Sequence, residues 1–79
     1  MRLDKYLKVS RLIKRRTIAN EACDGDFVFV NGKPAKASYQ VKVGDQIQLQ
    51  FSNRVLTVEV LNTDEIKNKA DAPTMYREI

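Results

Sequence analysis

The change from helix to strand falls within residues 18–34, which read IANEACDGDFVFVNGKP. A helix is predicted from about Arg15 to Cys23, because apolar side chains recur there at a spacing of four residues and so share one face. Those side chains are Ile18, Ala19, Ala22 and Cys23. Gly25 follows and is expected to end the helix in a left-handed conformation, which glycine adopts without strain.

The apolar period then becomes two in residues 27–30, a short run of strong β-forming residues. Asn31-Gly32 comes next and is the dipeptide that best tolerates the positive φ angles of a tight hairpin. The chain returns through residues 33–36, where Pro34 indicates an edge strand. Beyond a turn at residues 43–45, two more strands are predicted from alternating side chains. The inward-facing set is Ile47, Leu49, Phe51, Leu56, Val58 and Val60.

On the N-terminal side, a first helix is predicted over residues 2–9, where Leu3 and Leu7 lie four apart. Two helices followed by a small antiparallel sheet indicate one α+β domain over residues 1–61. Residues 62–79 lack an apolar period, so we expect a mobile C-terminal tail with a short ordered end at Met75 and Tyr76.

Positive charge is concentrated at one end of the chain. The 79 residues carry 14 Lys and Arg against 10 Asp and Glu, a net charge of +4. Residues 1–16 hold seven of the basic residues and one acid, Asp4, which gives +6, and the remainder sums to −2. A basic end on a slightly acidic body predicts a polyanionic partner.

The composition argues against catalysis. The chain has no histidine and one cysteine, and it shows no nucleophile–base pair, phosphate-binding glycine loop or spaced acidic pair. We therefore expect no enzyme activity, no cofactor, no metal and no internal disulfide, with Cys23 a small buried apolar side chain. Asp24 and Asp26 are interpreted as a solvated helix end. No apolar run has the length of a signal peptide or a membrane span, so a cytoplasmic protein is expected.

The candidate binding residues are all basic. Lys14-Arg15-Arg16 stands at the start of the second helix, where each cation costs about 0.3–1 kcal/mol, so the cluster favours a phosphate site over a solvated loop. The other candidates lie on the first helix, in the linker and on the hairpin, where a solubilising face or an ordinary exposed turn is the alternative. The full set is Arg2, Lys5, Lys8, Arg11, Lys14, Arg15, Arg16, Lys33 and Lys36.

Two further side chains receive supporting roles. Asp4, one turn before Lys8, is expected to orient a lysine or arginine. Tyr39 is expected to cover the sheet, with stacking on a base as the alternative. A DNA-binding helix-turn-helix is less favoured, because the basic residues of the second helix lie at its start, where phosphates bind. An RNA-modifying enzyme would need a partner subunit.

Residues 2–49 resemble the S-four-type RNA-binding domain. The landmarks are the RLDKYL opening, the arginine-rich start of the second helix, and V-x-V-N-G-x-x-x-x-x-S-Y-x-V-x-x-G-D-x-I. The resemblance implies the αL motif, an L-shaped arrangement in which two helices and a hairpin cradle structured RNA. It also implies RNA contacts from the candidate residues other than Lys8.

Among short stand-alone members, the chain resembles the RqcP group of bacterial ribosome-associated quality control. That likeness implies binding to large-subunit rRNA and to P-site tRNA on obstructed large ribosomal subunits, together with the factor RqcH during alanine tailing. The alternative is a recycling factor like heat-shock protein fifteen, which handles free large subunits carrying peptidyl-tRNA. A monomer with no membrane association is expected.

Overall fold

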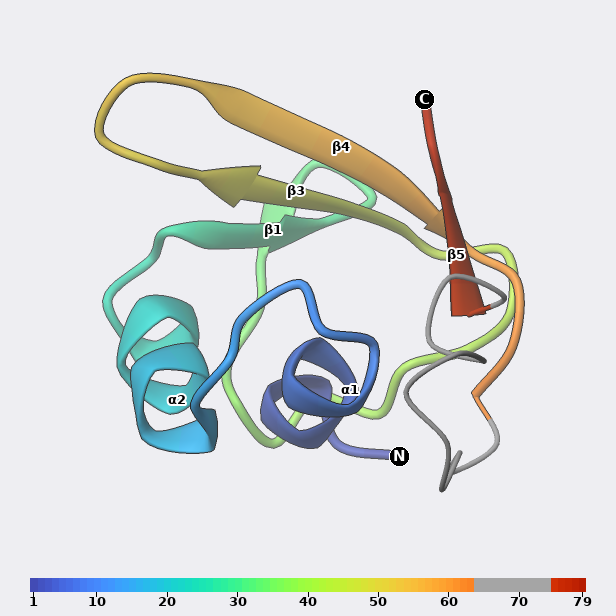
Figure 1. Ribbon diagram of the computed structural model, residues 1–79, viewed down its shortest axis with the longest axis horizontal. Coiled ribbons are helices and arrows are strands. Elements are labelled where there is room, and N and C mark those ends of the chain that lie inside the picture. The colour runs from blue at the N-terminus through green and yellow to red at the C-terminus, as the bar shows by residue number, and fades with distance from the viewer. Residues whose placement is uncertain (64–74) are drawn as a thin grey trace.

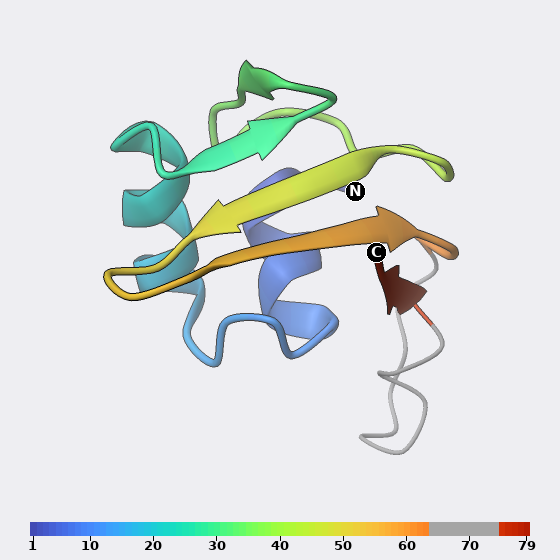
Figure 2. The same ribbon diagram turned by 90° about the horizontal axis from the view of Figure 1, so that it is seen from above.

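The computed structural model describes residues 1–63 and 75–79, and these form two layers (Figure 1). One layer holds the helices α1 (Leu3–Val9) and α2 (Arg16–Asp24), and the other is a five-stranded antiparallel sheet in the order β2-β1-β3-β4-β5. Its strands are β1 (Val28–Val30), β2 (Lys33–Pro34), β3 (Gln46–Gln50), β4 (Val55–Val60) and β5 (Tyr76–Glu78). Seen from above, both helices lie under one face of the sheet (Figure 2). The predicted α+β class is confirmed.

The core fills the space between the two layers. Leu3, Tyr6 and Leu7 of α1 are completely buried, and the sheet contributes alternate side chains of β1, β3 and β4. The predicted alternation holds for Ile47, Leu49, Val58 and Val60, which are at most 2% exposed. It fails at Phe51, which is 38% exposed because β3 ends at Gln50 and the chain turns away from the helices.

Helix α2 corrects two predictions. Ala19 and Cys23 are completely buried, but Ile18 is 49% exposed, because the helix packs against α1 on a narrower face than the spacing suggested. Gly25 is not left-handed, with φ −87°. Its N–H still bonds to the Glu21 carbonyl, so the positive φ falls one residue later, at Asp26.

The predicted hairpin is confirmed. Asn31 and Gly32 have φ of 52° and 85°, and β2 forms the edge of the sheet. The Asn31 side chain also ties the turn to β3, since its Oδ1 accepts from the Gln46 N–H at 3.0 Å and its Nδ2 donates to Asp45 at 3.1 Å. The Tyr39 hydroxyl donates to the same carboxylate at 2.8 Å. Tyr39 is also partly buried against the core, in line with its expected covering role, and Asn31, Tyr39 and Asp45 of the sequence motif form one hydrogen-bonded group.

The C-terminal residues belong to the sheet. β5 pairs with β4, Met75 is completely buried, and the Tyr6 hydroxyl donates to the Met75 carbonyl at 2.7 Å. The short ordered end expected at Met75 and Tyr76 is thus present, and a mobile tail is wrong for residues 75–79. Of the rest of that prediction, the Asn62 N–H donates to the Met75 carbonyl at 3.2 Å, and residues 64–74 with Pro73 lie outside the described residues.

Candidate RNA-binding surface

The start of α1 is held by the segment that follows the hairpin. The Leu3 N–H donates to the Tyr39 carbonyl at 2.8 Å, and the Val41 N–H donates to the Met1 carbonyl at 2.9 Å. Arg2 lies between these two bonds, pairs with Gln40 in an isolated β-bridge and is the N-cap residue of α1. The backbone position of Arg2 is therefore fixed while its side chain faces solvent.

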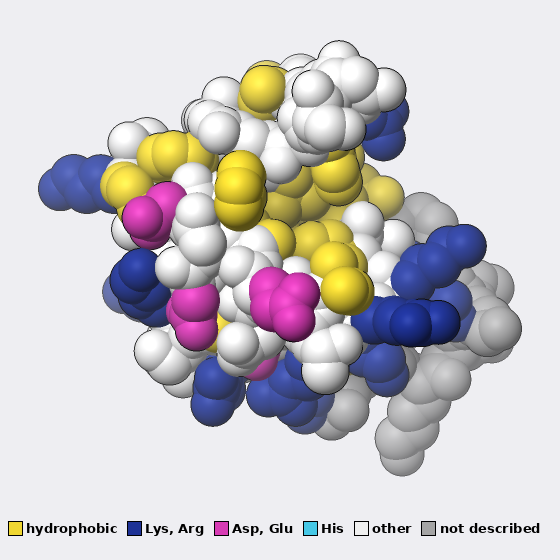
Figure 3. Space-filling model, turned by 90° about the vertical axis from the view of Figure 1, so that its left-hand side faces the viewer, with side chains coloured by type: hydrophobic (Ala, Val, Ile, Leu, Met, Phe, Trp, Pro, Cys, Tyr) yellow, Lys and Arg dark blue, Asp and Glu magenta, His cyan; other side chains and the backbone are white. Residues whose placement is uncertain are grey.

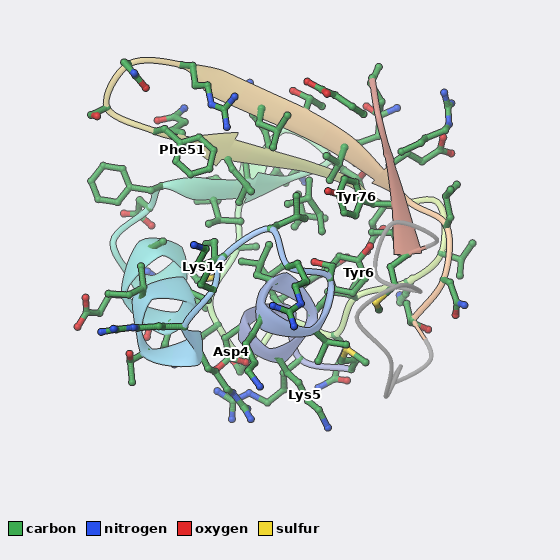
Figure 4. The ribbon with its side chains drawn as sticks, in the orientation of Figure 1. Asp4, Lys5, Tyr6, Lys14, Phe51 and Tyr76 are labelled. Carbon is green, nitrogen blue, oxygen red and sulfur yellow. The ribbon has the colours of Figure 1, made fainter. Side chains whose placement is uncertain are left out.

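Asp4 pairs with one basic side chain at the start of each helix, Arg2 at α1 and Arg16 at α2. It is 2% exposed and accepts hydrogen bonds from the Lys5 N–H at 2.8 Å and from Arg16 Nε and Asn20 Nδ2 at 3.3 Å each. Arg2 Nε lies 3.3 Å from Asp4 Oδ1. We call Arg2, Asp4, Arg16 and Asn20 the Asp4 cluster. Figure 4 shows Asp4 between α1 and α2, with Lys5 extending away from the sheet beside it.

The electrostatics of the Asp4 cluster keep its carboxylate charged. Burial alone would raise the pKa of Asp4, but hydrogen bonds from Asn20, Arg16 and the Lys5 amide outweigh burial and hold that pKa below its ordinary value. The arginine side chains remain 46% exposed. The expected role of Asp4 in orienting a basic residue is confirmed, but its partners are Arg2 and Arg16 instead of Lys8, because the carboxylate points into the contact between the helices.

A shallow hollow of about 380 Å³ adjoins the Asp4 cluster. Arg16, Thr17, Asn20 and Glu21 of α2 line it together with Asp4. Among these residues Arg16 carries the positive charge, and its guanidinium group, held by the Asp4 carboxylate, can donate to a phosphate oxygen, whereas Glu21 adds an acid to the same hollow. Asn20 and Thr17 were absent from the sequence-based candidates. The one signal for Asn20 was its position, one turn after Arg16 on the same helix.

The first turn of α2 holds no acid of its own, and the acid that pairs with Arg16 is Asp4 of α1. Arg15 is the N-cap residue, and no side chain caps the helix. Lys14, Arg15 and Arg16 are all exposed. In Figure 4, Lys14 lies nearer the sheet and Lys5 lies on the far side of the helices, so the basic residues spread over more than one face.

The remaining candidates divide between two places. Arg11 adopts φ 68°, in the turn after α1 that also brings the Ile13 N–H to the Leu7 carbonyl at 3.0 Å. The side chains of Lys8 and Arg11 are both exposed. Lys33 and Lys36 line a second hollow of about 610 Å³ beside the hairpin.

Lys36 connects that hollow to the end of α2. Its Nζ lies 3.4 Å from both the Asp24 carbonyl oxygen and Asp26 Oδ1, and Asp24 Oδ1 accepts from the Ala37 N–H at 3.1 Å. Asp24 and Asp26 are both exposed, as expected for a solvated helix end, and the Asp24 carboxylate in addition fixes the strand connection. The Asp4 N–H also donates to the Ala37 carbonyl at 3.3 Å, so Lys36 lies one residue from a contact with α1.

Other site types find no support in the part of the chain that the structure describes. Its acidic and cysteine side chains form no group of three that could hold a metal ion. Cys23 is buried as predicted, and burial, with the nearby charges of Asp4 and Asp24, raises its pKa to about 12. Neither described helix has the length and apolar character needed to cross a lipid bilayer.

Comparisons with known proteins identify the family of the chain. The S4 domain family matches residues 1–47. A protein named RQC P-site tRNA stabilizing factor from Halalkalibacterium halodurans is 51% identical over 76 residues, which cover 96% of this chain and 86% of that protein. Its namesake from Streptococcus pneumoniae is 53% identical with the same coverage. The trimeric structure of Vibrio cholerae heat shock protein 15 superposes with a TM-score of 0.91 at 32% identity, covering all of this chain and 81% of that one.

Proposed function

We propose that this chain, which belongs to the S4 domain family and to its group of RQC P-site tRNA stabilizing factors, binds structured RNA and acts on P-site tRNA in ribosome-associated quality control. The observation that carries the proposal is the Asp4 cluster. Its buried carboxylate holds Arg2 and Arg16 from two different helices at one place on the surface. Arginines fixed in this way lose little conformational freedom when they bind phosphate, so their contribution to affinity is larger.

The chemistry of binding follows from the geometry of the guanidinium group. Arg16 donates its Nε–H to Asp4, which leaves its two terminal nitrogens to grip phosphate oxygens in a bidentate manner. Arg15 and Lys14 add charge at the uncapped start of α2, where backbone N–H groups also favour anions. Contacts of this kind recognise the shape of an RNA backbone more than its sequence.

The finer proposal names the particle and the partners. The chain would bind large-subunit rRNA and tRNA or peptidyl-tRNA on obstructed large ribosomal subunits, and would work there with RqcH while alanine residues are added to the stalled nascent chain. It would act as a non-catalytic cytoplasmic monomer that needs no cofactor. The identity of about 50% to proteins named for P-site tRNA supports this role.

A second role has a specific observation in its favour. The close superposition on heat shock protein 15 supports a factor that recycles free large subunits carrying peptidyl-tRNA. The lower identity of 32% makes this the second choice. Tailing of a stalled nascent chain in cells lacking the protein would distinguish the roles, since only the first predicts that alanine addition is lost.

The test is sedimentation of a cell lysate on a sucrose gradient with tagged protein. We expect co-migration with large subunits, lost on Arg15→Ala/Arg16→Ala. The matched control, Lys42→Ala/Arg77→Ala, removes the same charge outside the candidate set and should leave co-migration intact. Retained co-migration of Arg15→Ala/Arg16→Ala would contradict the site. Loss of co-migration supports the site if the circular dichroism spectrum of the variant shows that it is folded.

Salt supplies an independent arm of the same test. Six or more phosphate contacts should weaken binding by about 10³-fold or more between 50 and 200 mM salt, by analogy with duplex DNA. Binding that does not change with salt would oppose the proposal. Competition by duplex DNA as effective as that by ribosomal RNA would favour a DNA-binding module instead.

A further inference from the structure

An apolar groove opens at the end of the molecule where α2, β1 and the β3–β4 turn meet. It has a volume of about 310 Å³. Three large apolar side chains line it although they are well exposed: Ile18 at 49%, Phe27 at 54% and Phe51 at 38%. Figure 3 faces this end and shows apolar side chains gathered in a hollow at its centre. None of the residues of the Asp4 cluster lines the groove, although α2 contributes residues to both sites.

Both aromatic rings stand on a fixed backbone. The Phe27 N–H donates to the Ala22 carbonyl, and the Phe27 carbonyl accepts from the Gln50 N–H, both at 2.9 Å. The Phe51 N–H donates to the Arg54 carbonyl at 2.8 Å. A Cβ on Gly25 would lie 3.2 Å from the Phe27 ring, so the ring also rests against the turn. The backbone that carries both rings is therefore fixed, while the rings themselves stay exposed to solvent.

Cations border the groove. The guanidinium carbon of Arg54 lies 5.3 Å from the centre of the Phe51 ring. Ile13 lines the groove, and Lys14, which is exposed, is the residue that follows it in the chain. Neither Lys14 nor Arg54 forms an ion pair with a described residue. In Figure 3, lysine and arginine side chains lie to the right of the hollow.

We propose that this groove binds an unpaired RNA base, which stacks on Phe27 and Phe51 while Arg54 and Lys14 hold the adjoining phosphates. Unpaired bases stack on aromatic rings and arginine planes, and their phosphates need cations close by. The polar side chains of Gln50 and Ser52, which also line the groove, can bond to base edges. A groove of this volume suits one nucleotide, whereas a stable protein partner would need about 800 Å² of surface.

The inference rests on the proposed RNA binding but concerns a different surface, so the two can fail separately. The chain has three tyrosines but no tryptophan, so Phe51→Trp places a single tryptophan, which can be excited selectively, in the groove. We expect oligoadenylate to quench its fluorescence, and an abasic oligonucleotide of equal length and charge to leave it unchanged. Val43→Trp, at a site 65% exposed and outside the groove, is the control and should not respond.

Affinity measurements complete the test. Phe27→Ala should weaken oligoadenylate binding by about 5- to 150-fold, the range for loss of one base stack. Phe27→Leu keeps apolar volume without a ring face and should weaken it similarly. Equal quenching by both probes, or full affinity of Phe27→Leu, would overturn the inference. The inference would also be overturned if Phe27→Ala bound oligoadenylate with unchanged affinity but no longer bound ribosomes, which would indicate that the groove binds a protein partner. Quenching that persists in Arg15→Ala/Arg16→Ala would support the groove even where ribosome binding is lost.

Discussion

Replacement of Asp4 by alanine should destabilise the domain more than any surface charge change. The substitution removes a buried carboxylate that accepts from the Lys5 N–H, Asn20 and Arg16. The donors then lie at the contact between α1 and α2 with no acceptor, and the penalty is that of desolvated, unsatisfied polar groups.

The magnitude can be worked from these contacts. A hydrogen bond to a charged group contributes about 1.5–3 kcal/mol, whereas the arginines, 46% exposed, can turn to water and contribute about 0–1 kcal/mol. We expect a loss of about 2–4 kcal/mol in the free energy of unfolding. A 79-residue domain has a total of about 4–12 kcal/mol. The melting temperature should therefore fall by about 8–30 °C.

The assay is urea denaturation followed by circular dichroism, at neutral and acidic pH. Asp4→Asn keeps the shape and one acceptor but not the charge, and it adds a pH signature. Because the folded-state pKa of Asp4 lies below its ordinary value, its charge stabilises the fold above about pH 4, the unfolded pKa. That stabilisation is lost as the pH falls through the folded pKa. The wild type should therefore approach Asp4→Asn in acid.

Asp26→Asn is the matched control, because it removes an exposed charge and asparagine tolerates the φ of 65° at this position. The Asp26 side chain is 63% exposed and pairs with Lys36, which is equally exposed, so the change should be below about 0.5 kcal/mol. The reasoning would be refuted if Asp4→Ala unfolded at the same urea concentration as Asp26→Asn, or if the difference in stability between the wild type and Asp4→Asn stayed constant in acid.

Three shorter predictions concern the rest of the fold. Met75→Ala should cost about 2–5 kcal/mol in urea denaturation, because the side chain is completely buried; a neutral result would mean that β5 adds nothing to the core. Tyr39→Phe removes the hydroxyl bonded to Asp45 and should cost about 1–2 kcal/mol, and an unchanged midpoint would show that the bond is dispensable. Cys23 should resist iodoacetamide at pH 8 until urea is added, because burial raises its pKa to about 12; rapid labelling of the native protein would contradict its burial.

Local sequence signals were sufficient where one short segment fixes its own conformation. Asn31-Gly32 specifies a turn with two positive φ angles, and both are observed. Pro34 excludes a central strand, and β2 lies at the sheet edge. The left-handed residue after α2 was misplaced, because Gly25 and Asp26 both tolerate the turn and the hydrogen bonds of the last helical turn determine which residue adopts it.

The basic residues of the candidate binding surface stay a prediction from the sequence, and their arrangement could not be predicted from it. The sequence by itself determined the α+β order of elements, the charge of +6 over residues 1–16, and the basic residues that can meet phosphate. Only the tertiary structure decided that Asp4 joins Arg2 to Arg16, that Met75 completes the core, and that Phe51 and Ile18 remain exposed beside Phe27. The physical reason is distance along the chain. Periodicity reports which residues share a face of one element, whereas contacts over many residues depend on how the helices and the sheet pack together.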